Sequence, residues 1–133
     1  NLGYRLEVGV SLPIILMNSN YKIVCIRGAT SLESDDPAEV REKVLELWNE
    51  LNVQNDIVRI ISVIFSVTPD IVSFNPATAL RENLMLEDVA LMCLQEAVFE
   101  NSPQRIIRIL IICEGGTQNF VYLHGAKDLR TKK

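Results

Sequence analysis

Five short apolar stretches and a single long amphipathic helix limit the folds that this chain can adopt. The stretches are rich in β-branched residues and end at glycine, proline or polar residues, as strands do. They cover residues 21–27, 58–68, 89–94, 105–113 and 120–123. With one long helix after the first strand and a short helix opening at Pro76, this order predicts an α/β (α+β) domain with one mixed five-stranded sheet.

The long helix is predicted from its cap and from its periodicity. Asp36 is a suitable N-cap, with Pro37 at the first helical position and Glu39 at the capping-box position. The helix places its apolar side chains on one face: Val40, Val44, Leu47, Trp48 and Leu51. One such helix cannot cover both faces of a sheet whose strands lack clean polar alternation. We therefore expect an oligomer, with ligand sites in the clefts between subunits.

Two arginines lie in or at the end of apolar stretches. Arg108 interrupts the apolar run Ile106–Ile112, and Arg27 ends the first predicted strand, just before Gly28. An arginine keeps its charge in proteins, so burying it without a partner costs several kcal/mol of folding free energy. Either carboxylates of the protein or an anionic ligand must neutralise these side chains, and the second case would indicate function.

Composition excludes several classes of function. The 133 residues fit one domain, and the net charge of −4 without a basic face does not suit a nucleic-acid binder. The three cysteines, Cys25, Cys93 and Cys113, are widely spaced in apolar runs, and there is one histidine. We expect reduced core thiols, a cytoplasmic protein and no metal site.

Residues 1–20 precede the first predicted strand. Residues 8–17 are apolar but too short to span a membrane, and they lack the features of a secretory signal. We interpret residues 1–20 as an N-terminal extension and residues 21–133 as the functional domain, with no membrane association.

Common catalytic and cofactor motifs are not found. No G-x-S-x-G accompanies His124, which we interpret as a strand-end or surface residue. No glycine-rich phosphate-binding loop occurs, and Glu114–Thr117 is predicted to form a hairpin turn.

Seven short blocks instead follow the order and spacing of one family. They are Ile26–Thr30, Ser66–Asp70, Pro76–Arg81, Cys93–Glu96, Ile107-Arg108, Val121–Leu123 and Leu129-Arg130. Over roughly Tyr21 to Arg130 the chain resembles the monofunctional, AroH-type chorismate mutases. The resemblance implies a homotrimeric pseudo-α/β barrel with active sites at the subunit interfaces. It also implies conversion of chorismate to prephenate, a [3,3] rearrangement in phenylalanine and tyrosine biosynthesis that needs no cofactor or metal.

The resemblance assigns the central roles. Arg108 would stabilise the negative charge on the breaking ether oxygen and touch a substrate carboxylate. Glu96 would accept a hydrogen bond from the substrate hydroxyl, and Cys93 would lie beside that hydroxyl. Arg27 would bind a carboxylate, with Tyr122 donating a hydrogen bond nearby.

The remaining family positions lie at the rim of the cleft. Arg81 and Arg130 would line its mouth, Arg130 from a C-terminal segment that closes on the ligand and follows Leu129. Thr78 replaces a frequent lysine, and Asn75 stands where the family usually has phenylalanine.

Two rival functions remain open at this point. Rid-type imine deaminases share the trimeric shape and an interface arginine, but Ile26–Thr30 together with Cys93-x-x-Glu96 favours the mutase. A non-catalytic regulatory trimer that binds a dicarboxylate is the other rival, and the presence of both Arg108 and Glu96 weighs against it.

Overall fold

One mixed five-stranded sheet forms the centre of the computed structural model, which describes residues 21–84, 86 and 88–129. The expected extension at residues 1–20 and the predicted site residue Arg130 lie outside the described residues. The elements are β1 (Lys22–Ser31), α2 (Pro37–Gln54), β2 (Ile57–Val67), α3 (Pro76–Asn83), β3 (Ala90–Gln95), β4 (Ile106–Gly115), β5 (Val121–Tyr122) and the 3-10 helix η1 (His124–Leu129). The strand order is β3-β2-β4-β1-β5. β4 runs antiparallel to its neighbours β1 and β2, whereas β3 runs parallel to β2 and β5 runs parallel to β1. The sheet is therefore mixed, and the predicted fold class is confirmed.

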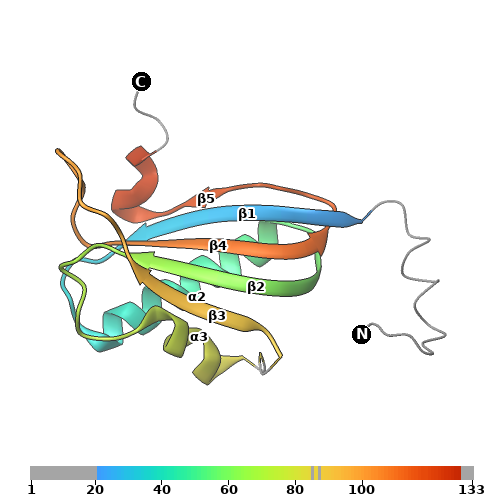
Figure 1. Cartoon of the computed structure of the whole chain (residues 1–133), viewed down its shortest axis with the longest axis horizontal. Coiled ribbons are helices and arrows are strands. Elements are labelled where there is room, and N and C mark those ends of the chain that lie inside the picture. Colours follow the sequence, from blue (N-terminus) through green and yellow to red (C-terminus); the bar gives the residue numbers. More distant parts are fainter. Residues whose placement is uncertain (1–20, 85, 87, 130–133) are drawn as a thin grey trace.

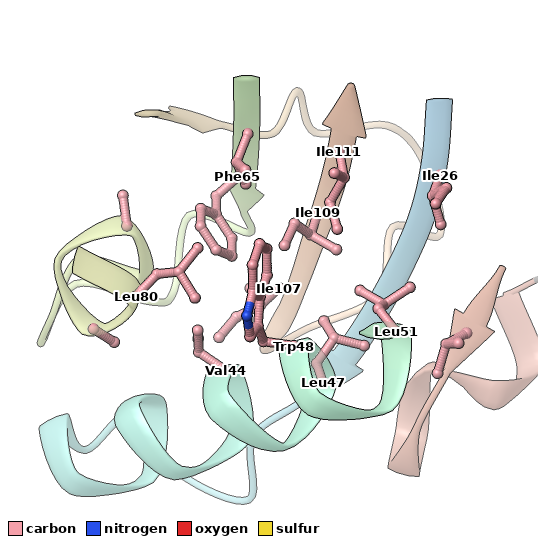
Figure 2. Close-up of a cluster of buried hydrophobic side chains, with 14 of the residues drawn as sticks. Ile26, Val44, Leu47, Trp48, Leu51, Phe65, Leu80, Ile107, Ile109 and Ile111 are labelled. Atoms are coloured by element: carbon pink, nitrogen blue, oxygen red, sulfur yellow. The ribbon is translucent and has the colours of Figure 1, made fainter. Parts of the chain in front are cut away.

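Both α-helices, α2 and α3, pack on the same face of the sheet (Figure 1). The Asp36 side chain caps α2 by accepting from the Glu39 amide at 3.2 Å, as predicted. The core between the helices and the sheet is apolar. Removing its side chains from water stabilises the fold by about 1.5–3 kcal/mol for each large residue. Figure 2 shows it built from Val44, Leu47, Trp48 and Leu51 of α2, Leu80 of α3, and Ile26, Phe65, Ile107, Ile109 and Ile111 of the strands.

Within residues 21–84, 86 and 88–129, the other side of the sheet, here called the open face, is covered at one end only. There η1 packs over Ala29 and Ile106, both fully or almost fully buried. Elsewhere large apolar side chains on this side meet solvent, including Ile23 (57% exposed), Met92 (54%) and Leu94 (50%). Apolar patches of this kind mark association surfaces. The predicted shortage of helical cover is therefore real in a single copy.

The first strand is longer than predicted. We expected it to end before Gly28, but β1 continues to Ser31. The strand continues because residues 28–31 still pair with β4. A glycine suits position 28 because β5 approaches its backbone closely: an added Cβ would lie 2.9 Å from the Val121 carbonyl oxygen and 3.2 Å from Leu47 and Leu51. The other strand boundaries agree with the predictions to within two residues.

Gly28→Ala is therefore expected to destabilise the fold by about 1–3 kcal/mol, since backbone and core must shift to admit a methyl group. Urea unfolding followed by circular dichroism measures this change. Gly116→Ala, at an exposed glycine with ordinary φ, should change the free energy of unfolding by less than about 0.5 kcal/mol. Equal stability of the Gly28→Ala variant and the wild type would contradict the close approach of β5.

The predicted hairpin at Glu114–Thr117 is wrong. Gly115 is the last residue of β4 and pairs with both Lys22 and Ile57. The chain then crosses over so that β5 pairs in parallel with β1 on its far side. This crossover matters for function, because it brings Tyr122 opposite Ala29.

Two smaller expectations also change. Glu39 does not complete the capping box, since its carboxylate accepts from the amides of Glu33 and Ser34; the Glu33 amide holds the pKa of Glu39 below its usual range. All three cysteines are free, but only Cys113 is buried in the core, whereas Cys25 is exposed on the open face. None of the helices in the described part of the chain is both long and apolar enough to cross a membrane.

Candidate active site

The open face carries a cluster of charged groups in its middle. Arg108 of β4 lies opposite Ser66 of β2, and Arg27 of β1 lies opposite Leu110 of β4. Because side chains alternate between the faces of a sheet, all four project from the open face. They surround a hollow of about 200 Å³ that is lined by Arg27, Ile64, Ser66, Arg108, Ile109 and Leu110.

Arg108 has a carboxylate partner in the same chain. Its Nε donates to Oε1 of Glu96 at 2.8 Å, and the two side chains are 38% and 19% exposed. Glu96 follows the end of β3, where its amide donates to the Val67 carbonyl at 2.8 Å and continues the β2–β3 pairing. Among the described residues only Nε is engaged, so the two terminal amino groups of the guanidinium remain to bind a ligand.

Arg27 has no carboxylate partner among residues 21–84, 86 and 88–129. Its guanidinium lies over the ring of Phe120, 4.8 Å from the ring centroid. Two guanidinium groups and one carboxylate leave the cluster with a net positive charge, which suits an anionic ligand. One of the two arginines is thus neutralised by the protein itself, and the other is available to a ligand.

Tyr122 joins the cluster through the short strand β5. It pairs with Ala29, whose other neighbour in the sheet is Arg108. Tyr122 and Leu129 pack against the small apolar cluster of Ala29, Ile106 and Ala126 under η1. The C-terminal segment therefore places a phenol on the same face of the sheet as the two arginines.

Cys93 lies on the opposite side of the sheet. It pairs with Phe65, a fully buried core residue, and packs against the core from the edge strand β3. Burial raises the pKa of its thiol, which therefore stays protonated at neutral pH. With Asn75 it lines a second hollow, of about 290 Å³, between β3 and the start of α3.

The rim residues of α3 belong to this same edge, here called the β3–α3 edge. Asn75 caps α3, its side-chain oxygen accepting from the Ala77 amide at 2.8 Å, which accounts for a polar residue there. Phe74 instead lies under the Arg41 guanidinium, whose central carbon is 4.1 Å from the centroid of the ring. Arg81, in the last turn of α3, is exposed, and Thr78 is half-buried.

A single copy thus separates the predicted site residues into two groups. The open face holds Arg27, Glu96, Arg108 and Tyr122, with Leu129 beside them. The β3–α3 edge holds Asn75, Thr78, Arg81 and Cys93. Sequence reasoning missed Ser66, whose hydroxyl donates to Glu96 at 3.2 Å; its place in the Ser66–Asp70 block was the available signal.

Together these features define a binding site for a small anionic molecule on an α+β sheet, and comparison with known proteins identifies the class. The sequence matches the family of type I chorismate mutases over residues 23–133. It is 33% identical to chorismate mutase AroH of Thermus thermophilus, covering 79% of this chain and 91% of that protein. It is 30% identical to chorismate mutase AroH of Bacillus subtilis (strain 168), covering 65% and 69%. The structure of a chorismate mutase from Clostridium thermocellum matches with a TM-score of 0.71 and 33% identity, covering 79% of this chain and 98% of that one.

The chain belongs to the type I chorismate mutase family. Its function is accordingly that of a chorismate mutase, and the imine deaminase and regulatory alternatives are set aside.

Proposed function

We propose that chorismate is converted to prephenate between two copies of this chain in a homotrimer. In this arrangement the open face of one copy meets the β3–α3 edge of the next. The observation that carries the proposal is the separation of the site residues, because neither group alone encloses a ligand. Each copy would contribute one open face and one edge, so a closed ring of three copies has three sites.

The uncovered apolar surface supports the same arrangement. Large side chains such as Met92 and Leu94 remain about half exposed in one copy. Burying them against neighbouring copies would be favourable by about 25 cal/mol per Å² of apolar area. The charged cluster would then lose contact with bulk water, which strengthens its interactions with a bound dianion.

Arg108 has the geometry needed for the main catalytic role. In the transition state the ether C–O bond breaks ahead of C–C bond formation and leaves negative charge on the ether oxygen. With Nε held by Glu96 at 2.8 Å, the guanidinium is oriented before the substrate arrives. Its terminal amino groups can then donate to the ether oxygen and to a carboxylate, which is preorganised electrostatic stabilisation.

The other open-face residues hold the substrate in its reactive shape. Arg27 carries the charge that binds a carboxylate, and Tyr122 donates a hydrogen bond beside it. Chorismate must adopt a compact pseudo-diaxial conformer, and fixing its charged ends selects that conformer. Glu96 accepts from the substrate hydroxyl through the oxygen that Arg108 does not use.

The neighbouring copy completes the cleft from its β3–α3 edge. Cys93 would bring a neutral thiol near the substrate hydroxyl, since burial raises its pKa. Arg81 adds positive charge at the mouth, with Thr78 and Asn75 forming a polar rim. By the family pattern, Arg130 closes over the ligand after Leu129. A cytoplasmic site of action suits the three free cysteines.

The direct test mixes the purified protein with chorismate and follows its ultraviolet absorbance, then acidifies the mixture to convert prephenate into phenylpyruvate. Loss of chorismate with matching phenylpyruvate, abolished in Arg108→Ala, is the expected result. A folded trimer that binds chorismate without turnover would contradict the proposal.

A further inference from the structure

Ser66 is the one polar side chain in the charged hollow to which the proposed mechanism gives no role. It lies on β2 directly opposite Arg108. It lines the same hollow as Arg27 and Arg108, and it is half-buried there. Its hydroxyl donates to Oε1 of Glu96 at 3.2 Å.

The Oε1 atom of Glu96 therefore accepts two hydrogen bonds, one from Ser66 and one from Arg108. Within the part of the chain that the structure describes, Oε2 accepts none. The carboxylate is thus held by one oxygen and offers the other to a ligand. This is the orientation that a carboxylate needs to receive a substrate hydroxyl.

The two donors differ in their other partners when the substrate binds. Arg108 keeps Nε on Glu96 while its terminal amino groups donate to the ether oxygen and to a carboxylate, so contacts with the substrate also act on its position. Within the part of the chain that the structure describes, the Ser66 hydroxyl has no second partner, so it serves Glu96 alone. Ser66 is anchored in a paired strand, and the adjacent Val67 carbonyl fixes the Glu96 amide at 2.8 Å.

The rest of the Ser66–Asp70 block fixes the start of β4. The Thr68 hydroxyl accepts from the Ile106 amide at 3.0 Å, and the Asp70 carboxylate accepts from the Arg105 amide at 3.1 Å. These contacts lie just before Arg108. The block thus tethers Glu96 on one side and the strand that carries Arg108 on the other.

We propose that Ser66 is a positioning residue, which acts through Glu96 by holding its Oε1 so that Oε2 faces the substrate hydroxyl. This inference rests on the proposed function of the site. It assigns a task to a residue that does not itself touch the reacting atoms.

The test compares kcat and KM for chorismate in three single variants. Ser66→Ala should lower kcat roughly tenfold with a smaller change in KM, since a hydrogen bond to a charged group is lost. Ser66→Thr keeps the hydroxyl and should recover most of the activity. Ser62→Ala is the matched control: Ser62 lies on the same strand, but its hydroxyl donates to the Ala90 carbonyl at 3.1 Å. Its kcat should stay within about twofold of wild type.

A double-mutant cycle separates positioning from general structure. In a Glu96→Ala background, adding Ser66→Ala should have no further effect, because Ser66 then has nothing to position. Equal losses in both backgrounds, or a normal kcat in Ser66→Ala, would overturn the inference while leaving the mutase function intact. A wild-type protein without turnover would overturn the proposed function, and this inference with it.

Discussion

Arg108→Lys is expected to lower kcat for chorismate by about 10²- to 10³-fold, the loss seen when one preorganised donor to a developing oxyanion is removed. Lysine keeps the positive charge but offers one ammonium in place of a planar fork. It cannot hold Glu96 through one nitrogen, as Nε does at 2.8 Å, while donating to the ether oxygen through others. Steady-state kinetics measures the change, and kcat should fall much more than KM rises.

Arg59→Lys is the matched control for this substitution. Its Nε donates to Glu114 at 2.9 Å, so it repeats the arginine–carboxylate geometry on a neighbouring strand, away from the charged hollow. Its kcat should remain near the wild-type value. If Arg108→Lys also turned over chorismate at a near-normal rate, charge alone would be sufficient and the proposed role of the guanidinium would be wrong.

Ile112→Asp is expected to prevent assembly and reduce activity to about a hundredth or less. Ile112 lies on β4, the central strand, and projects from the open face between Cys25 and Ser62. Burying an unpaired carboxylate in an apolar interface weakens association by several kcal/mol. Sedimentation velocity should show monomers for this variant and trimers for the wild type, and circular dichroism should show that the variant is folded.

Val53→Asp is the control for a new surface charge. Val53 lies in the last turn of α2 and is 78% exposed, on an element that covers the other side of the sheet. This variant should remain trimeric and active. A trimeric, active Ile112→Asp variant would show that the open face is not the surface that assembles.

Local signals predicted the elements of this fold well, because they depend on neighbouring residues. The cap at Asp36, Pro37 at the helix start and the apolar face of α2 are all readable over a few positions. The pairing of β5 with β1 cannot be predicted in this way, because it joins segments that are far apart in the sequence. That long-range contact explains the false hairpin at Glu114–Thr117, and the continued pairing of β1 with β4 up to Ser31 explains the premature strand end at Gly28.

The site could be predicted in part for the same reason. The arginines were conspicuous because they interrupt apolar strands, and the open face does bring Arg27 and Arg108 to one hollow. Cys93 and Glu96 were expected in one cavity, but they are an odd number of residues apart on an extended segment. Alternation therefore turns them to opposite sides of the sheet. The proposed arrangement of two copies would reunite them.

Complementation between two inactive variants tests this central claim most directly. Arg108→Ala removes a group of the open face, and Arg81→Glu reverses a charge on the β3–α3 edge. Both positions are at least partly exposed, so both chains should fold. Each variant alone should be nearly inactive.

Equal amounts of the two variants, unfolded together and refolded into mixed trimers, should regain about a quarter of wild-type activity, since one interface in four then combines an intact open face with an intact edge. A mixture of Arg108→Ala with Arg27→Ala should regain none, because both changes fall on the same face. Recovery in the first mixture but not the second is the predicted result. Mixed trimers without recovery in either would mean that each copy holds a complete site of its own.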